Sequence, residues 1–175
     1  MGIGEVIGLI GISTDITELK QTQGQLRNTN KRAQNIFQGV IDSLPVLLFW
    51  TDKQQKIIGN NLPHAKAFGF YNIQEMIGRS VSDFSKKVGL DSSIVAKVQA
   101  DHHEIISTKQ GKAIEYTAKL SDDKEKTWLS QKEPLLNENG QAIGVIGISM
   151  DISELKDTQK NWRDPMRSSR NLLRI

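Results

Sequence analysis

The sequence of 175 residues contains no cysteine. Its absence excludes disulfide bonds, thiolate metal sites and cysteine nucleophiles. Long apolar runs are also missing, because the N-terminal run Val6–Ile12 is interrupted by glycines and is too short to cross a bilayer. We therefore expect this segment to make no membrane contact, whether or not its parent protein is attached to a membrane elsewhere.

The sequence also lacks a strong excess of positive or of negative charge. The 23 basic and 20 acidic residues give a net charge of +3 and are interspersed along most of the chain, so we expect no nucleic-acid partner. The arginines after Trp162 are interpreted as a solvated tail, and Pro165 is expected to keep the preceding helix short. An apolar fraction of 37% suffices for one core, which predicts one domain with extra segments.

What the sequence does contain is an internal repeat. Gly4–Arg27 returns as Gly140–Arg163, with 15 of 24 residues identical. A repeat of this length and separation indicates a duplicated unit of domain size. We therefore expect residues 1–14 to be the final strand of a preceding domain. Val6–Ser13 would then be a strand without its sheet, and we expect it to be disordered or to join a neighbouring chain's sheet edge.

Each copy of the repeat passes from a β-rich run into a helix start. Ile143–Met150 is rich in β-forming residues and is followed by Asp151, a favourable N-cap residue. Glu154 three residues later predicts a capping box, and Asp15 with Glu18 predicts the same arrangement in the first copy.

Residues 15–44 show a heptad pattern, which predicts a helical coiled-coil linker and a homodimer formed through it. Polar residues in the middle of the seam favour a short parallel coiled coil that is specified by register more than by strength. A single helix that packs its apolar stripe on its own domain is the alternative. The seam positions are Ile16, Leu19, Gln23, Leu26, Asn30, Ala33, Phe37, Val40 and Leu44.

Downstream of the linker the pattern predicts two strands, a series of helices and three further strands. The expected elements are strands at Val46–Asp52 and Lys56–Asn60, helices at Asn61–Phe68, Ile73–Ile77 and Ser92–Lys109, and strands at Ile114–Leu120, Thr127–Leu136 and Gln141–Met150.

This order of elements resembles that of PAS sensory domains, and local motifs strengthen the resemblance over Ile36–Lys156. The departure from the family pattern is small: Ser153 replaces the threonine of the Asp-Ile-Thr exit motif, which residues 15–17 carry in full. The segments similar to the family pattern are Asn61 with Phe68-Gly69-Phe70, Met76–Ser80, Pro134–Gly140, Val145–Ser149 and Asp151-Ile152-Ser153.

The resemblance implies an α+β fold in which a five-stranded antiparallel sheet carries helices on one face, preceded by a long linker helix and followed by a short one. The domains are then a preceding-domain fragment (1–14), the linker (15–44), the PAS domain (45–151) and an exit helix with tail (152–175). The family further implies a non-enzymatic sensory module of a bacterial, cytoplasmic signalling protein. Its output domain would lie in the same parent chain, such as a histidine kinase of a two-component system, a cyclic-dinucleotide enzyme or a transcription regulator.

The end of the last strand is the expected relay point. A ligand that favours one conformation of this strand shifts the balance between states, and the strand-to-helix junction passes the shift on. A well-capped helix start without a relay role is the alternative. The relay residues are Asp151, Ile152, Ser153 and Glu154, with Asp15 and Glu18 in the first copy.

The resemblance also implies a pocket between sheet and helices for a small ligand or partner. We expect no cofactor, with a haem- or flavin-binding sensor as the alternative; cysteinyl-flavin chemistry is excluded. A filled core in a ligand-free dimerisation module is a further alternative. The pocket candidates are Trp50, Phe68, Phe70, Ile94, Val98, Tyr116 and Trp128.

Two adjacent histidines, His102 and His103, lie near the end of the longest predicted helix. Because charged Asp101 and Glu104 flank them, we expect a solvated helix face and not a haem ligand. Neighbouring helical residues point about 100° apart and His64 is distant in sequence, so no metal site is predicted. No nucleophile motif appears, and an enzyme is not predicted.

Overall fold

The computed structural model describes residues 11, 14–119, 124–160 and 162, and it divides into two compact units, Met1–Gly39 and Val40–Ile175. The first unit holds most of α1 (Thr17–Ser43), the predicted long N-terminal helix. Asp15 caps its start, because the Thr17 amide donates to Asp15 Oδ1 at 2.9 Å. The apolar seam of this unit is exposed at Ile16, Leu19, Leu26 and Phe37.

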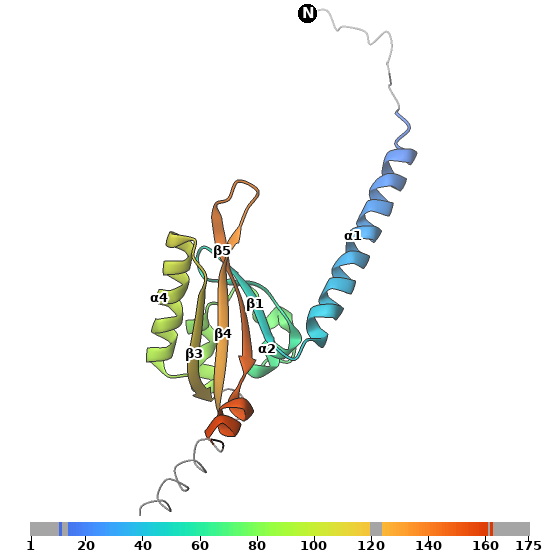
Figure 1. Ribbon diagram of the computed structural model, residues 1–175. Coiled ribbons are helices and arrows are strands. Elements are labelled where there is room, and N and C mark those ends of the chain that lie inside the picture. The colour runs from blue at the N-terminus through green and yellow to red at the C-terminus, as the bar shows by residue number, and fades with distance from the viewer. Residues whose placement is uncertain (1–10, 12–13, 120–123, 161, 163–175) are drawn as a thin grey trace, which may run out of the picture. The chain divides into compact units, whose positions relative to one another are not determined.

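The second unit is built on one antiparallel sheet of five strands (Figure 1). The strand order is β2-β1-β5-β4-β3, so the last strand lies between the first and the fourth. All neighbouring strands are antiparallel, which confirms the predicted sheet. The strands are β1 (Leu47–Asp52), β2 (Ile57–Asn60), β3 (Lys112–Lys119), β4 (Glu125–Leu136) and β5 (Ala142–Asp151).

Short helices and one longer helix connect β2 to β3 and cover one face of the sheet, as predicted (Figure 1). The turns near Ser80 were not predicted, although the Ser80 amide donates to Asp83 Oδ2 at 2.6 Å in a capping box that the sequence contains. The helical elements are α2 (Leu62–Ala67), η1 (Ile73–Glu75), α3 (Val81–Phe84), η2 (Ser85–Val88) and α4 (Ser92–Thr108).

Asn61 joins the end of α1 to β1 and α2 through a fully buried side chain. Its Oδ1 accepts from the amides of Leu48 at 3.0 Å and His64 at 3.1 Å. Its Nδ2 donates to the carbonyls of Ile41 at 3.0 Å and Val46 at 2.8 Å. All four hydrogen-bonding positions of the amide are therefore used inside the fold.

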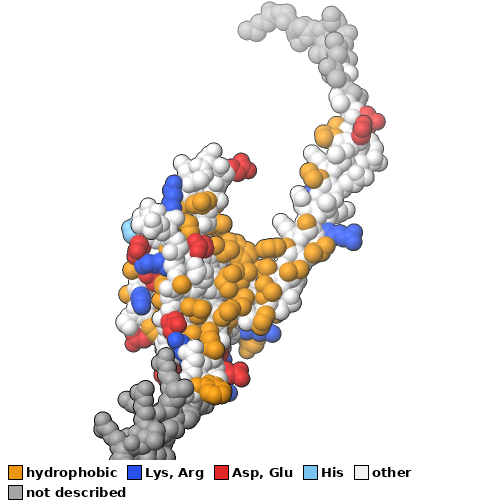
Figure 2. Space-filling view, in the orientation of Figure 1, with side chains coloured by type: hydrophobic (Ala, Val, Ile, Leu, Met, Phe, Trp, Pro, Cys, Tyr) orange, Lys and Arg blue, Asp and Glu red, His pale blue; other side chains and the backbone are white. Residues whose placement is uncertain are grey.

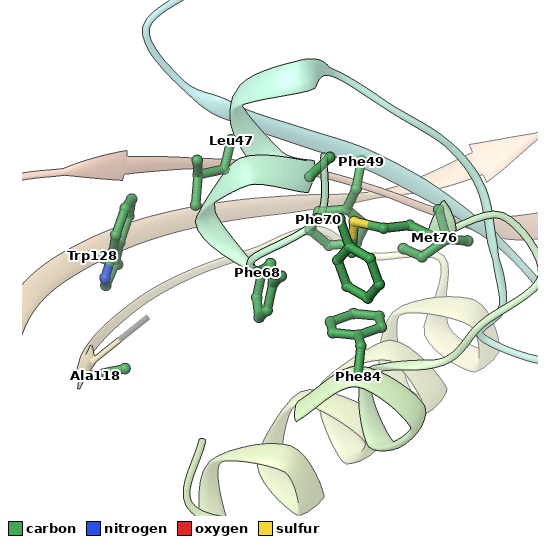
Figure 3. Close-up of a cluster of buried hydrophobic side chains, with 10 residues drawn as sticks. Leu47, Phe49, Phe68, Phe70, Met76, Phe84, Ala118 and Trp128 are labelled. Carbon is green, nitrogen blue, oxygen red and sulfur yellow. The ribbon is translucent and has the colours of Figure 1, made fainter. Parts of the chain in front are cut away.

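The core lies between the sheet and the helices (Figure 3). In β1 the side chains alternate, so that Leu47 and Phe49 point toward the helices and pack with Phe68, Phe84 and others. The opposite face of the sheet exposes Ile58, Ile148 and Met150, and Figure 2 shows hydrophobic side chains gathered over the sheet. The predictions made for residues 1–13, for Pro165 and for the arginine-rich tail fall, apart from Gly11, outside the described residues.

Candidate functional site

A cavity of about 60 Å³ lies between the inner face of the sheet and the helices, enough for a few water molecules or a compact ligand. Its apolar lining comes from Leu47, Phe49, Ile57, Phe68, Val81, Phe84, Leu90, Ile94 and Val98. Its polar lining comes from Thr51, Gln55, His64, His102, Tyr116, Ser130, Lys132 and Ser149.

The two-residue period of the strands explains why polar side chains reach this cavity. Trp128 faces the core from β4, and residues two and four positions further, Ser130 and Lys132, therefore face the same way. In β5, Ser149 faces inward while its neighbours Ile148 and Met150 are exposed. The sheet thus presents hydroxyl and amino groups to the interior.

Two buried histidines flank the ring of Phe49. The Phe49 ring centroid lies 5.2 Å from that of His64 and 5.8 Å from that of His102. Burial lowers the pKa of His64 to about 3, and burial, with the charge of Lys132, lowers the pKa of His102 to about 3 as well. Both imidazoles are neutral at pH 7, so each offers one donor and one acceptor nitrogen.

Several of these nitrogens have no hydrogen-bond partner among the described residues. They are His64 Nδ1 and both ring nitrogens of His102, and all are inaccessible to solvent. A buried polar group that lacks a partner costs about 1–3 kcal/mol. The imidazoles are therefore groups whose hydrogen bonds a bound molecule would complete.

The prediction that His102 lies on a solvated helix face is wrong, because His102 is only 3% exposed. Its charged neighbours suggested an outward position, but α4 places Val95, His102 and Ile105 on one buried face, at spacings of seven and three residues. His103, one residue later, is exposed as predicted. The helical period of the buried residues is the sequence signal that identifies His102 as an interior residue.

Lys132 is the charged group of the cavity and is itself 3% exposed. Burial lowers the pKa of its amine to about 8, Asp101 opposes this shift, and the positive charges of Lys112 and Lys97 add to it. Asp101 already pairs with Lys112 at 3.0 Å, and Lys112 also contacts Glu104 at 2.6 Å. The ammonium of Lys132 thus has no contact ion pair within the described part of the chain.

The hydroxyl groups of the cavity, in contrast, are engaged with one another. Ser149 Oγ donates to Ser130 Oγ at 3.0 Å, which links β5 to β4. Burial raises the pKa of Tyr116, and a hydrogen bond with Ser149 partly offsets this. Thr51 Oγ1 accepts from the Val145 amide at 3.4 Å. These groups are therefore less available to a ligand than Lys132 and the histidines.

Among the seven predicted pocket residues, the structure places Phe68, Ile94, Val98 and Tyr116 in the cavity wall. Phe70 and Trp128 belong to the adjoining hydrophobic core and do not line the cavity. Trp50 lies on the other face of β1, where its ring covers Gly59: a Cβ on that glycine would lie 2.1 Å from the indole. Sequence reasoning missed His64, His102 and Lys132. The two-residue period of β4 places Lys132 in the cavity wall, and the helical period of α4 places His102 there, together with His64.

The predicted relay residues lie at the end of β5. Asp151 Oδ1 accepts from Ser153 N at 3.0 Å and Ser153 Oγ at 2.6 Å, and Asp151 Oδ2 lies 3.5 Å from Lys126 Nζ. Partial burial raises the pKa of Asp151. The Ser153 hydrogen bonds and the Lys126 charge together lower it by more, so that the net effect is a lowered pKa. Helical residues 153–160 follow.

This junction is also tied to β4. The Ile152 amide donates to the Thr127 carbonyl at 2.8 Å, and the Thr127 amide donates to Ser153 Oγ at 2.9 Å. Ile152 is buried, whereas Glu154 is exposed. Ser153, and not Glu154, completes the cap that Asp151 begins.

No three histidine, aspartate or glutamate side chains converge as metal ligands within the residues that the structure describes. In the same part of the chain, no helix combines the length and apolarity that a bilayer crossing requires.

Comparison with known proteins identifies the fold. The family model of the PAS fold matches residues 41–157. The chain is similar to Vibrio cholerae VqmA, at 16% identity and a TM-score of 0.60, over 67% of this chain and 50% of VqmA. The chain thus spans about half the length of VqmA. No curated protein sequence matches it.

Two isolated PAS domains are also similar in structure. One comes from a Colwellia psychrerythraea protein, at 21% identity and a TM-score of 0.53, and covers 72% of this chain and 98% of its own. The other is the PAS domain of Bordetella pertussis BvgS, at 18% identity and a TM-score of 0.55, covering 78% and 98%. At these identities the likeness establishes the fold.

The prediction of no nucleic-acid partner is contradicted by the comparison with VqmA. VqmA has been solved in complex with ligand and DNA, so proteins that contain this fold include a DNA-binding regulator. The prediction relied on the interspersed charge and the net charge of +3. The charge of a chain that spans about half of such a protein does not report on the contacts of the whole protein, and this is why the reasoning failed.

Proposed function

Because the chain belongs to the PAS fold family, we propose that it is a sensory module that binds a small ligand in the cavity between its sheet and helices. PAS domains are sensory and regulatory and do not in general catalyse reactions. The observation that carries the proposal is the lining of the cavity. A filled structural core leaves few polar groups unsatisfied. Here His64 Nδ1 and both ring nitrogens of His102 have no hydrogen-bond partner among the described residues, and both histidines line one space with the buried Lys132.

The signal leaves the cavity through β5 in this proposal. Ser149 lines the cavity and lies two residues before Asp151, which caps the exit helix. A ligand that displaces Ser149 from its hydrogen bond with Ser130 changes how β5 sits against β4 at the point where the Ile152 and Thr127 backbones meet. Coupling of this type is worth about 1–3 kcal/mol.

The flanking segments extend the proposal. The exposed apolar seam of α1 supports a homodimer through residues 15–44, and the repeat of Gly4–Arg27 supports a preceding domain of the same kind. The output domain would follow residues 152–175 in a cytoplasmic parent protein, with a histidine kinase as the proposed type and Asp15 and Glu18 as the relay of the preceding domain.

A haem or a flavin is a poorer fit than a compact ligand. The neutral imidazoles of His64 and His102 have suitable chemistry for an axial ligand, but a cavity of about 60 Å³ is far below the 300–1,000 Å³ or so of pockets for drug-sized molecules. A macrocycle or a tricyclic ring would have to displace Phe49 and Phe68 from the core.

A fragment screen by thermal shift tests the proposal. Molecules that bind the folded state alone raise the melting temperature. Ser130→Leu fills part of the cavity, and Ser107→Leu makes the same change at an exposed position of α4. We expect fragments that stabilise the wild type and Ser107→Leu but not Ser130→Leu. If no fragment stabilises the wild type, or if all hits persist in Ser130→Leu, the chain does not bind a ligand in this cavity.

A further inference from the structure

We propose that the ligand of this cavity is a small monoanion of the carboxylate class, whose charge lies at Lys132 and whose compact apolar body lies against Phe49 and Phe68. This inference rests on the proposed function and specifies the chemistry of its ligand. It is carried by the charges, the free hydrogen-bonding groups and the apolar wall that meet in one cavity.

The charge balance around Lys132 leaves one positive charge uncompensated. Lys97, Lys112 and Lys132 face two acids, Asp101 and Glu104, and Lys112 contacts both acids, at 3.0 and 2.6 Å. Lys97 is exposed and solvated, whereas Lys132 is buried. An ion removed from water costs several kcal/mol unless a counter-ion offsets it. A bound anion is such a counter-ion.

His102 adds a donor beside this charge. Lys132 and His102 line the same cavity, and the positive charge of Lys132 contributes to the lowered pKa of His102. A neutral imidazole has one N–H, and neither ring nitrogen of His102 has a partner among the described residues. A carboxylate oxygen on the ammonium and the other on this N–H would satisfy both groups at once.

The aromatic part of the cavity wall determines the apolar body of the ligand. Phe49 lies between the two imidazoles, and Phe68 lies 5.1 Å from His64 by ring centroids. The cavity of about 60 Å³ leaves room for a short apolar body and is too small for an aromatic ring, since benzene occupies a cavity of about 150 Å³. A cationic ligand would place a second positive charge beside Lys132, and a neutral ligand would leave its ammonium without a counter-ion.

The pH dependence of binding follows from the same groups. Asp101 stabilises the charged form of Lys132, Lys97 and Lys112 oppose it, and Glu104 contacts Lys112. The imidazole of His102, which lines the same cavity, is neutral at pH 7. With a pKa of about 8 in the free protein, Lys132 is an ammonium below that pH and an amine above it. The affinity for an anion should therefore fall about tenfold for each pH unit above 8, because the protonated fraction falls tenfold.

Three probes of similar small size test the inference: acetate, acetamide and ethylamine, with calorimetry and thermal shift on the full chain at pH 7 and pH 9. We expect acetate to bind the wild type at least tenfold more tightly than acetamide, and ethylamine to bind least. Lys132→Met should weaken acetate binding at least tenfold and leave acetamide binding unchanged. Lys86→Met, which removes an exposed lysine from η2, is the matched control and should bind acetate as the wild type does.

Equal binding of acetate and acetamide, or unchanged acetate binding by Lys132→Met, overturns the inference. Absence of acetate binding at millimolar concentration overturns it too. These failures differ from failure of the proposed function: fragments that are neutral or cationic and are lost in Ser130→Leu would keep the cavity as a ligand site while refuting an anionic ligand.

Discussion

Replacing Lys132 by methionine should stabilise the protein at neutral pH. Methionine preserves most of the apolar stem and removes a charge that is buried beside the cavity. The pKa of Lys132 falls from 10.5 to about 8 on folding, and at about 1.4 kcal/mol per unit this corresponds to a cost of about 3 kcal/mol. Relaxation of the protein around the charge reduces the effective penalty, so we expect a gain of about 1–3 kcal/mol.

The pH dependence separates this effect from a change in packing. Between pH 8 and 10.5 the unfolded chain binds more protons at this site than the folded chain, so wild-type stability gains a contribution that grows with pH. The difference between variant and wild type should therefore be largest at or below pH 8 and should shrink toward pH 10.5. Chemical denaturation at pH 7, 8, 9, 10 and 10.5 measures it. A difference that stays constant across this range would refute the reasoning.

Three further predictions concern the same interior. His64 and His102 have pKa values of about 3 in the folded state, so stability should fall by about 1.4 kcal/mol per pH unit for each histidine as pH drops below 6.5. Denaturation of His102→Leu should show a shallower fall. Asn61→Ala should cost about 3 kcal/mol or more in the free energy of unfolding, because four backbone partners lose a hydrogen bond, three of which are buried and one, to Val46, partly buried. Gly144→Ala should lower the melting temperature markedly, because its Cβ would lie 1.7 Å from the carbonyl oxygen of Thr51.

Matched controls accompany these variants. Asn72→Ala removes an exposed cap, in which Asn72 Oδ1 accepts from the Glu75 amide at 3.2 Å, and should cost only about 1 kcal/mol. Gly24→Ala places a Cβ in open space on α1 and should be neutral or slightly stabilising. If Asn61→Ala is no worse than Asn72→Ala, or Gly144→Ala no worse than Gly24→Ala, the packing argument for those two sites is wrong.

The strands and the main helices could be predicted because local sequence patterns specify them. Alternation in β3 and β4, the Asn137–Gly140 turn and the caps at Asn61 and Asp151 each have a short-range cause. The region near Ser80 was missed, because a helix of four residues is too short to show an apolar period.

The candidate site was predicted only in part, because residue type and position gave conflicting signals. Aromatic residues were assigned to the pocket by type, yet Trp50 faces outward, since its neighbours Phe49 and Thr51 take the inner face of β1. Lys132 shares the inward period of Trp128, but a lysine is seldom buried without a partner. His102 was assigned by its charged neighbours and not by its helical face. Candidate functional groups are found at buried positions that hold a polar or charged residue, where local pattern and residue type disagree.

Amide hydrogen exchange at Ile152 and Ser153 tests the central claim most directly. The Ile152 amide donates to the Thr127 carbonyl at 2.8 Å, at the junction between the sheet and the exit helix. A fragment that binds in the cavity should change the exchange rate of these two amides at least several-fold in the wild type and leave it unchanged in Ser130→Leu. If a fragment shown to occupy the cavity leaves both rates unaltered, the cavity does not communicate with the exit helix.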